Sequence, residues 1–204
     1  ATPSGRLPVS LPRSAGAQPY SYLHPLLGGP SGVTSTDPTP VRPFGFGLSY
    51  TSFERAGLTV DGVSSGAGAT ASGTADVRAG DVFTVSARVT NTGGVRGADV
   101  VQVYAHRAVA SVTRPVAQLV AYARVELDPG ESAEVRFTVP ASRLAYSDRS
   151  LRRVVEPGEV ELRLGPSCAE VDETAALRVT GATYELSGDD ARVVEVEVRR
   201  ASSR

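Results

Sequence analysis

The stretch Val82-Phe83-Thr84-Val85-Ser86-Ala87-Arg88-Val89-Thr90 alternates between apolar and polar side chains from its second residue onward. Because successive side chains of a β-strand point to opposite faces of the sheet, the apolar residues Phe83, Val85 and Val89 are expected on one face. The polar residues are then expected on the other face. Such alternation is typical of a strand with one side buried and the other in water, so the stretch predicts part of an antiparallel sheet.

The same period of two recurs along the chain beyond residue 53. The clearest repeats are the apolar sets Val101/Val103/Ala105, Val135/Phe137/Val139, Val160/Leu162/Leu164 and Val194/Val196/Val198. Weaker strands are predicted at 55–61, 116–126 and 175–180. Turn sequences with Gly or Pro separate the strands at Asn91-Thr92-Gly93-Gly94, Asp128-Pro129-Gly130 and Glu156-Pro157-Gly158. Seven or eight short strands without a helical period predict an all-β fold, an antiparallel sandwich of the immunoglobulin or fibronectin type III-like kind.

The segments outside this region have a different character. Nine of the 14 prolines lie at or before Pro43, and proline removes a backbone donor and disfavours helix in the residue before it. Residues 1–53 are therefore predicted to be extended, looping chain. The Gly/Ala/Ser-rich stretch Ser64–Gly73 is predicted to be a flexible loop.

The C-terminal tail, residues 182–204, is predicted to turn around Asp189-Asp190 and to add an edge strand at 191–199. The outer face of that strand carries Glu195, Glu197 and Arg199. Charged side chains on an edge strand are expected to discourage edge-to-edge association.

The charge and residue composition of the chain exclude some classes of binding partner. The chain has 21 basic and 22 acidic residues, a formal net charge of −1, so no broad field attracts nucleic acid or an anionic membrane, and neither partner is expected. No apolar run approaches the ~18 residues of a membrane span. Cys168 is the only cysteine, which excludes an intrachain disulfide. A cytoplasmic and a secreted bacterial protein are both compatible with the sequence.

Several landmarks, in order along the chain, resemble the C-terminal region of glycoside hydrolase family 3, including its fibronectin type III-like domain. They lie at 42–53, 89–93, 100–104, 114–115, 127–131 and 156–158, with Leu144-Ala145-Tyr146 in place of the family's Leu-Ser-Tyr and Tyr122 at a position where Phe is common. Upstream, 3–12 is similar to the Gly-Lys-Leu-Pro-Val-Ser-Phe-Pro element that closes the family's α/β sandwich domain. The resemblance implies three parts: 1–53, a remnant and linker of that α/β domain; 54–181, the sandwich; and 182–204, a tail.

The family resemblance also implies an activity for the parent protein. Family 3 enzymes hydrolyse terminal β-linked glucosides, xylosides and related sugars with retention, through a carboxylate nucleophile and a separate acid. In the family both groups lie upstream of the part that this chain matches, so no catalytic residue is expected here. The expected partners are the catalytic domains of the same enzyme, and the parent's substrate is a β-linked oligosaccharide. The chain itself is expected to be a structural module; a carbohydrate- or protein-binding module is the alternative.

Each residue that could suggest chemistry of its own also has a simpler explanation. Asp37, before a proline in a Ser/Thr-rich turn, is expected to accept local backbone N–H groups. His24 and His106 have no Cys or carboxylate at ligand spacing, so no metal site is expected, and His106 is interpreted as a solvated imidazole at a strand end. Cys168 has no adjacent base and is expected to be inert, and Ser167 lacks the Gly-x-Ser-x-Gly elbow.

The stretch Gly45-Phe46-Gly47 lacks the third glycine, strand and helix of a dinucleotide-binding loop, so no cofactor is expected. Its glycines are interpreted as allowing a sharp turn while nearby aromatic side chains bury against neighbouring domains. Those aromatic residues are Phe44, Phe46, Tyr50 and Phe53. Without such domains, residues 1–53 are expected to be poorly packed and unprotected in hydrogen exchange. Tyr20, Tyr22 and Tyr184 are the candidates for exposed sugar-binding platforms.

Overall fold

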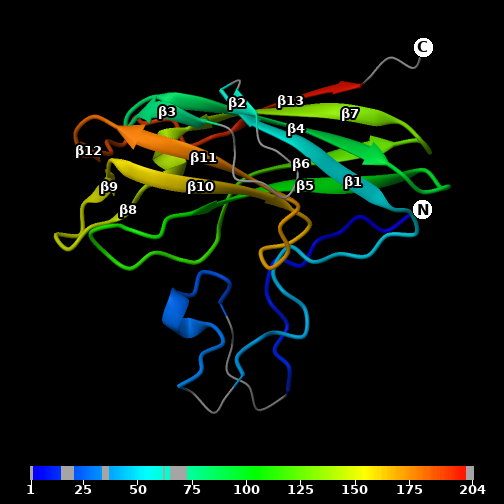
Figure 1. Cartoon of the computed structure of the whole chain (residues 1–204), viewed down its shortest axis with the longest axis horizontal. Coiled ribbons are helices and arrows are strands. Elements are labelled where there is room, and N and C mark those ends of the chain that lie inside the picture. The colour runs from blue at the N-terminus through cyan, green and yellow to red at the C-terminus, as the bar shows by residue number, and fades with distance from the viewer. Residues whose placement is uncertain (1, 15–20, 34–36, 62, 65–72, 201–204) are drawn as a thin grey trace.

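The computed structural model describes residues 2–14, 21–33, 37–61, 63–64 and 73–200. Two β-sheets pack face to face, and a small third sheet lies at one end (Figure 1). The strands are β1 Phe53–Val60, β2 Val63–Ser64, β3 Thr74–Arg78, β4 Val82–Asn91, β5 Gly97–His106, β6 Gln118–Leu127, β7 Ser132–Pro140, β8 Tyr146–Ser147, β9 Arg153–Val155, β10 Gly158–Gly165, β11 Glu173–Thr180, β12 Tyr184–Glu185 and β13 Glu195–Arg200. Two short 3₁₀ turns are η1 Leu26–Gly28 and η2 Ala141–Leu144. Within the described ranges, no helix reaches the length and apolar character that crossing a membrane requires.

The first sheet has the strand order β13-β7-β4-β1-β2 and the second has the order β3-β11-β10-β5-β6. The third sheet is β12-β9-β8. The predicted all-β sandwich is confirmed, with one exception to antiparallel pairing. Strand β3 runs parallel to β11, with Ala75 opposite Leu177 and Val77 opposite Val179.

The predicted strands all form, with ends that differ by a few residues. Strand β13 begins at Glu195, after the predicted start at 191, and pairs antiparallel with β7 as an edge strand. The sequence pattern does not predict β2, β3, β8, β9 and β12, because these strands have two to five residues, too few to establish a period of two. In the predicted loop Ser64–Gly73, Ser64 belongs to β2 and residues 65–72 lie outside the described residues.

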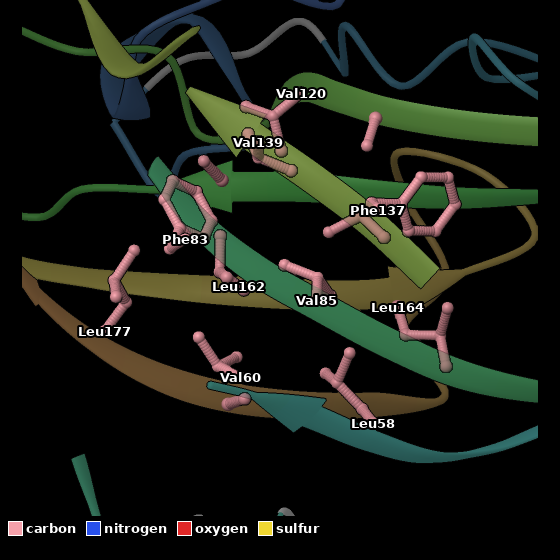
Figure 2. Packing of buried hydrophobic residues seen from close by; sticks show 14 of the residues in the cluster. Leu58, Val60, Phe83, Val85, Val120, Phe137, Val139, Leu162, Leu164 and Leu177 are labelled. Atoms are coloured by element: carbon pink, nitrogen blue, oxygen red, sulfur yellow. The ribbon is translucent and has the colours of Figure 1, made fainter. Parts of the chain in front are cut away.

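The core lies between the two large sheets and follows the alternation seen in the sequence. Every second residue of β4, beginning with Phe83, is buried, and in the register with β7 Val85 lies opposite Phe137. Large side chains from both sheets interdigitate there (Figure 2). The fully buried ones include Leu58, Phe83, Phe137, Leu162, Leu164 and Leu177. Burying each such side chain contributes about 1.5–3 kcal/mol, and the free Cys168 forms no bridge that could add to this.

The fully buried side chain of Asn91 stabilises the Asn-Thr-Gly turn through four hydrogen bonds. Its Oδ1 accepts hydrogen bonds from Gly93 N–H at 3.1 Å and from Thr51 Oγ1 at 2.7 Å. Its Nδ2 donates to Val95 O at 2.9 Å and to Leu127 O at 3.1 Å. One amide therefore joins the β4–β5 turn, the end of β6 and the segment that enters β1.

We expect Asn91→Ala to lower the free energy of unfolding by about 2–4 kcal/mol, because it leaves several buried polar groups without partners. Urea denaturation followed by circular dichroism measures this loss. The control is Thr92→Ala next to it, an exposed position expected to change stability by less than about 0.5 kcal/mol. Equal losses for the two variants would contradict the role given to Asn91.

Candidate functional site

The N-terminal segment lies against the second sheet, below the sandwich in Figure 1. Residues 2–11 and 41–47 run side by side: Leu7 N–H donates to Phe46 O at 2.9 Å and Gly45 N–H donates to Leu7 O at 2.9 Å. Leu11 pairs with Arg42 in an isolated antiparallel bridge. These two stretches form an irregular ribbon that sits beside β5.

A buried ion cluster fastens this ribbon to the sandwich. The carboxylate of Asp99, at the start of β5, is fully buried and contacts the guanidinium groups of Arg6 and Arg55. Arg55 Nη2 donates to Asp99 Oδ1 at 2.8 Å, and its Nη1 lies 3.4 Å from Asp172 Oδ2. Arg6 comes from the ribbon and Arg55 from β1 in the opposite sheet. One carboxylate therefore connects both sheets and the N-terminal segment.

A second contact requires glycine at residue 45. Gln102 Nε2 donates to Gly45 O at 3.2 Å and to Pro166 O at 2.7 Å, while Tyr104 donates its hydroxyl to Gln102 Oε1 at 2.7 Å. Gly45 has φ of 83°, and a Cβ there would overlap Gln102 Oε1 and Tyr104 Oη. The Gly-Phe-Gly stretch is thus a backbone fit onto β5, consistent with the predicted sharp turn.

The aromatic residues of this segment pack mainly within the chain itself. Phe44 stacks on Tyr22 with ring centroids 3.9 Å apart and meets Tyr104 edge-on at 6.5 Å. Phe53 packs against the core. Tyr50 remains 77% exposed. The expectation that residues 1–53 are poorly packed alone is therefore wrong for the ribbon, because β5 supplies its partners.

Between the ribbon and β6 lies an open hollow of about 620 Å³. Its lining includes Leu7, Phe44, Leu119, Tyr122 and Arg124. Tyr122 is 64% exposed, at the position where the family commonly has Phe. Apolar side chains are also exposed along the rest of the N-terminal segment. They are Val9, Leu11, Leu23, Leu26, Leu27, Val33, Val41, Leu48 and Tyr50. These exposed apolar side chains make the N-terminal segment a candidate for contact with another surface.

Three landmarks far apart in sequence meet in a second cluster. The Arg114 guanidinium lies 4.1 Å from the centroid of the Tyr146 ring, and Tyr146 donates its hydroxyl to Glu156. Ser111 also donates to Glu156. Although burial alone raises the pKa of the Glu156 carboxyl, the hydrogen bonds from Ser111 and Tyr146 bring it below the usual value. The Arg-Pro, Leu-Ala-Tyr and Glu-Pro-Gly stretches are therefore parts of one cluster of interacting side chains.

The carboxylates around a neighbouring open hollow of about 720 Å³ are each engaged by a donor. Glu156 is held as described above. Arg178 Nε donates to Glu159 Oε1 at 2.8 Å, and Arg163 Nε donates to Glu161 Oε1 at 2.6 Å. Each of these acids thus has an ordinary structural partner.

The other candidate residues have equally local environments. Asp37 Oδ1 accepts the Thr39 N–H at 2.9 Å, as predicted. His106 does end β5, but it is half-buried with Nδ1 2.8 Å from Val116 O, so its interpretation as a solvated imidazole is wrong. His24 Nδ1 lies 2.8 Å from Pro25 O. Within the described residues, no group of three or more His, Cys, Asp and Glu could hold a metal ion.

The remaining candidates concern a nucleophile and sugar-binding tyrosines. Burial raises the pKa of the Cys168 thiol to about 11, and Ser167 is buried beside it. Tyr184 donates to Asp190 Oδ1 at 2.7 Å and lies against Gly80, while one face of Tyr22 is covered by Phe44. Tyr20 lies outside the described residues.

Comparison with known proteins agrees with this architecture. The profile of the fibronectin type III-like domain family matches residues 99–168. A β-xylosidase of Formosa agariphila is 36% identical across 87% of this chain, and a periplasmic β-glucosidase of Salmonella typhimurium is 36% identical across 84%. The crystal structure of a β-glucosidase from Listeria innocua in complex with glucose superimposes with a TM-score of 0.74 at 29% identity over 89% of this chain. The chain spans only 23%, 22% and 25% of these three proteins, respectively.

The fold and the profile define a fibronectin type III-like β-sandwich protein. Together with the relatives and the structural neighbours, they are consistent with the C-terminal region of glycoside hydrolase family 3.

We expect Asp99→Ala to lower the free energy of unfolding by about 3–5 kcal/mol, because it leaves two arginines without their buried partner. Chemical denaturation measures the loss. The control is Asp172→Ala, which removes the other, partly exposed carboxylate near Arg55 and is expected to cost about 0–1 kcal/mol. If the two losses were equal, the buried cluster would not have the importance given to it.

We expect the Cys168 thiol of the native chain to react with iodoacetamide at pH 8 roughly a hundredfold or more slowly than that of the urea-unfolded chain. The reason is that a pKa of about 11 leaves very little thiolate at that pH. Mass spectrometry of quenched samples gives both rates. A native rate close to the unfolded one would show that the thiol is neither buried nor inert.

Proposed function

We propose that this chain is the C-terminal structural module of an enzyme that hydrolyses terminal β-linked glucosides or xylosides. In this proposal residues 1–53 are the end and linker of a preceding α/β domain, 54–181 are the sandwich and 182–204 are a tail. The catalytic carboxylates belong to upstream domains, and no residue of this chain has a catalytic, cofactor-binding or metal-binding role. The module acts by burying apolar surface against those domains.

The observation that carries the proposal is the apolar surface of the N-terminal segment. Leu26 is 77% exposed and Leu27 84% exposed, although both belong to a short ordered turn, η1. The hollow beside Tyr122 is lined by residues of both the ribbon and β6. The matched relatives are about four times as long, so each has several hundred further residues that could cover such a surface. Two of these relatives are a β-xylosidase and a β-glucosidase.

A second candidate function is binding of a polysaccharide by the sandwich. The exposed ring of Tyr122 favours it, because sugars stack on flat aromatic faces. Fold alone does not decide between the two functions, since sandwiches host many roles. In affinity electrophoresis on xylan or glucan, a purely structural module migrates unretarded and a binding module is retarded.

The experiment compares the full-length protein with a version that lacks residues 54–204. We expect the shortened version to lose most hydrolysis of aryl β-glucosides and β-xylosides and to melt at a lower temperature, because its catalytic domains lose a covering surface. The purified 204-residue chain is expected to have no such activity. Undiminished activity and stability after truncation would contradict the proposal.

Leu26→Asp is the matched point substitution. We expect it to destabilise the full-length protein by about 2 kcal/mol and to leave the isolated chain unchanged, because Leu26 is exposed in the chain alone. Val82→Asp, at an exposed site on the other sheet, is the control and is expected to affect the isolated chain and the full-length protein equally.

A further inference from the structure

Strand β13 ends the first sheet, and its outer edge is paired with no strand that the structure describes. All six of its residues are exposed. Such an edge presents unpaired N–H and C=O groups, which are a template for another strand. The charges on β13 and its neighbours determine which strand can pair with this edge.

The exposed face of the sheet carries two rows of alternating charge that run toward this edge. In the first row, Arg88 of β4 lies opposite Glu134 of β7, which lies opposite Arg199 of β13. In the second row, Arg136 of β7 lies opposite Glu197 of β13. Opposite charges on directly facing residues stabilise a pair of strands, and like charges destabilise it. Within β13, Arg199 also donates to the Glu197 carboxylate at 2.9 and 3.1 Å. An added strand that continues the alternation presents an acid opposite Arg199 and a base opposite Glu197.

A second copy of β13 meets this requirement. Facing residues of an antiparallel pair point to the same side of the sheet, so a two-fold axis between two copies must pass through a residue position. An axis at Glu197 or at Arg199 puts that charge opposite itself, and an axis at Val196 puts Glu195 opposite Glu197. An axis at Val198 puts Glu197 opposite Arg199 of the other copy, twice. The sign alternation of both rows then continues across the junction.

The other side of the strand accommodates this register, in which Val198 faces its own copy and Val196 faces Arg200 of the other copy. Val196 lies opposite Phe137 and Val198 opposite Val135 on β7, so both valines point to the core side of the sheet. They are nevertheless 46% and 41% exposed, because β13 lies at the sheet's edge. With the axis at Val198, this residue faces its own copy and the two side chains cover each other.

We propose that two copies of this chain associate through antiparallel pairing of their β13 strands about an axis at Val198, which joins their first sheets into one continuous sheet. On the charged face, which the sequence predicts to discourage association, each of the other registers considered contains at least one like-charge pair. The register with the axis at Val198 contains only opposite-charge pairs among Glu197 and Arg199. The contact is a symmetric, isologous one, as in most homodimers.

The test begins with sedimentation velocity of the full chain from low to high micromolar concentration, where a concentration-dependent dimer is expected. Glu197→Arg and Arg199→Glu, each alone, are expected to raise the dimer dissociation constant about tenfold, since both cross-strand pairs become repulsive. An equimolar mixture of the two variants restores both opposite-charge pairs across the junction and is expected to form a heterodimer. Glu159→Arg, on β10, makes the same charge change away from the edge and is expected to leave association unchanged.

Cysteine crosslinking tests the register. Facing residues have Cα atoms about 4.5–5.5 Å apart, which allows a disulfide, so Val198→Cys is expected to give a crosslinked dimer on mild oxidation. Val196→Cys has similar exposure, but its own copy is displaced by about 13 Å along the strand, so it is expected to stay uncrosslinked. A chain that stays monomeric, a mixture that does not associate, or equal crosslinking of the two variants would overturn the proposal.

Discussion

The arrangement of this molecule depends on one buried carboxylate, that of Asp99. It lies where β5 begins, and it holds Arg55 from the opposite sheet and Arg6 from the N-terminal ribbon. A buried charge is costly unless it is paired, so each arginine must occupy its place for the other contacts to be favourable. This mutual requirement fixes the ribbon on the sandwich by contacts within the chain. The ribbon in turn places Phe44 and Gly45 over Tyr104 and Gln102.

The two large sheets have different outer surfaces. The second sheet carries the ribbon, the hollow beside Tyr122 and the exposed leucines of η1, a largely apolar surface that suits stable docking to other domains. The first sheet carries rows of alternating charge that end at β13. Charged rows suit a weaker and more register-specific contact. Under the two proposals, one side of the module contacts the other domains of its enzyme and the β13 edge contacts a second copy.

The sequence was sufficient to predict the long strands, because their alternation directly reflects burial between two sheets, and Val82–Asn91 shows this most clearly. It also located the Asn91 and Gly45 turns, whose chemistry is local. The ion cluster was missed because Arg6 and Arg55 lie 93 and 44 residues from Asp99, and nothing in an isolated Arg or Asp indicates its partner. The cluster of Arg114, Tyr146 and Glu156 could not be predicted either, because its residues are far apart in the sequence. Each of the three lies in a landmark stretch that the sequence does show.

Hydrogen exchange of the 204-residue chain, followed residue by residue, tests the central claim most directly. If the Asp99 cluster holds the ribbon in place without upstream domains, the amides of Leu7 and Gly45, which are hydrogen-bonded within the ribbon, exchange far more slowly than in a free peptide. The amide of the exposed residue Tyr50 serves as the internal reference and is expected to exchange quickly. Exchange of Leu7 and Gly45 at free-peptide rates would contradict the account.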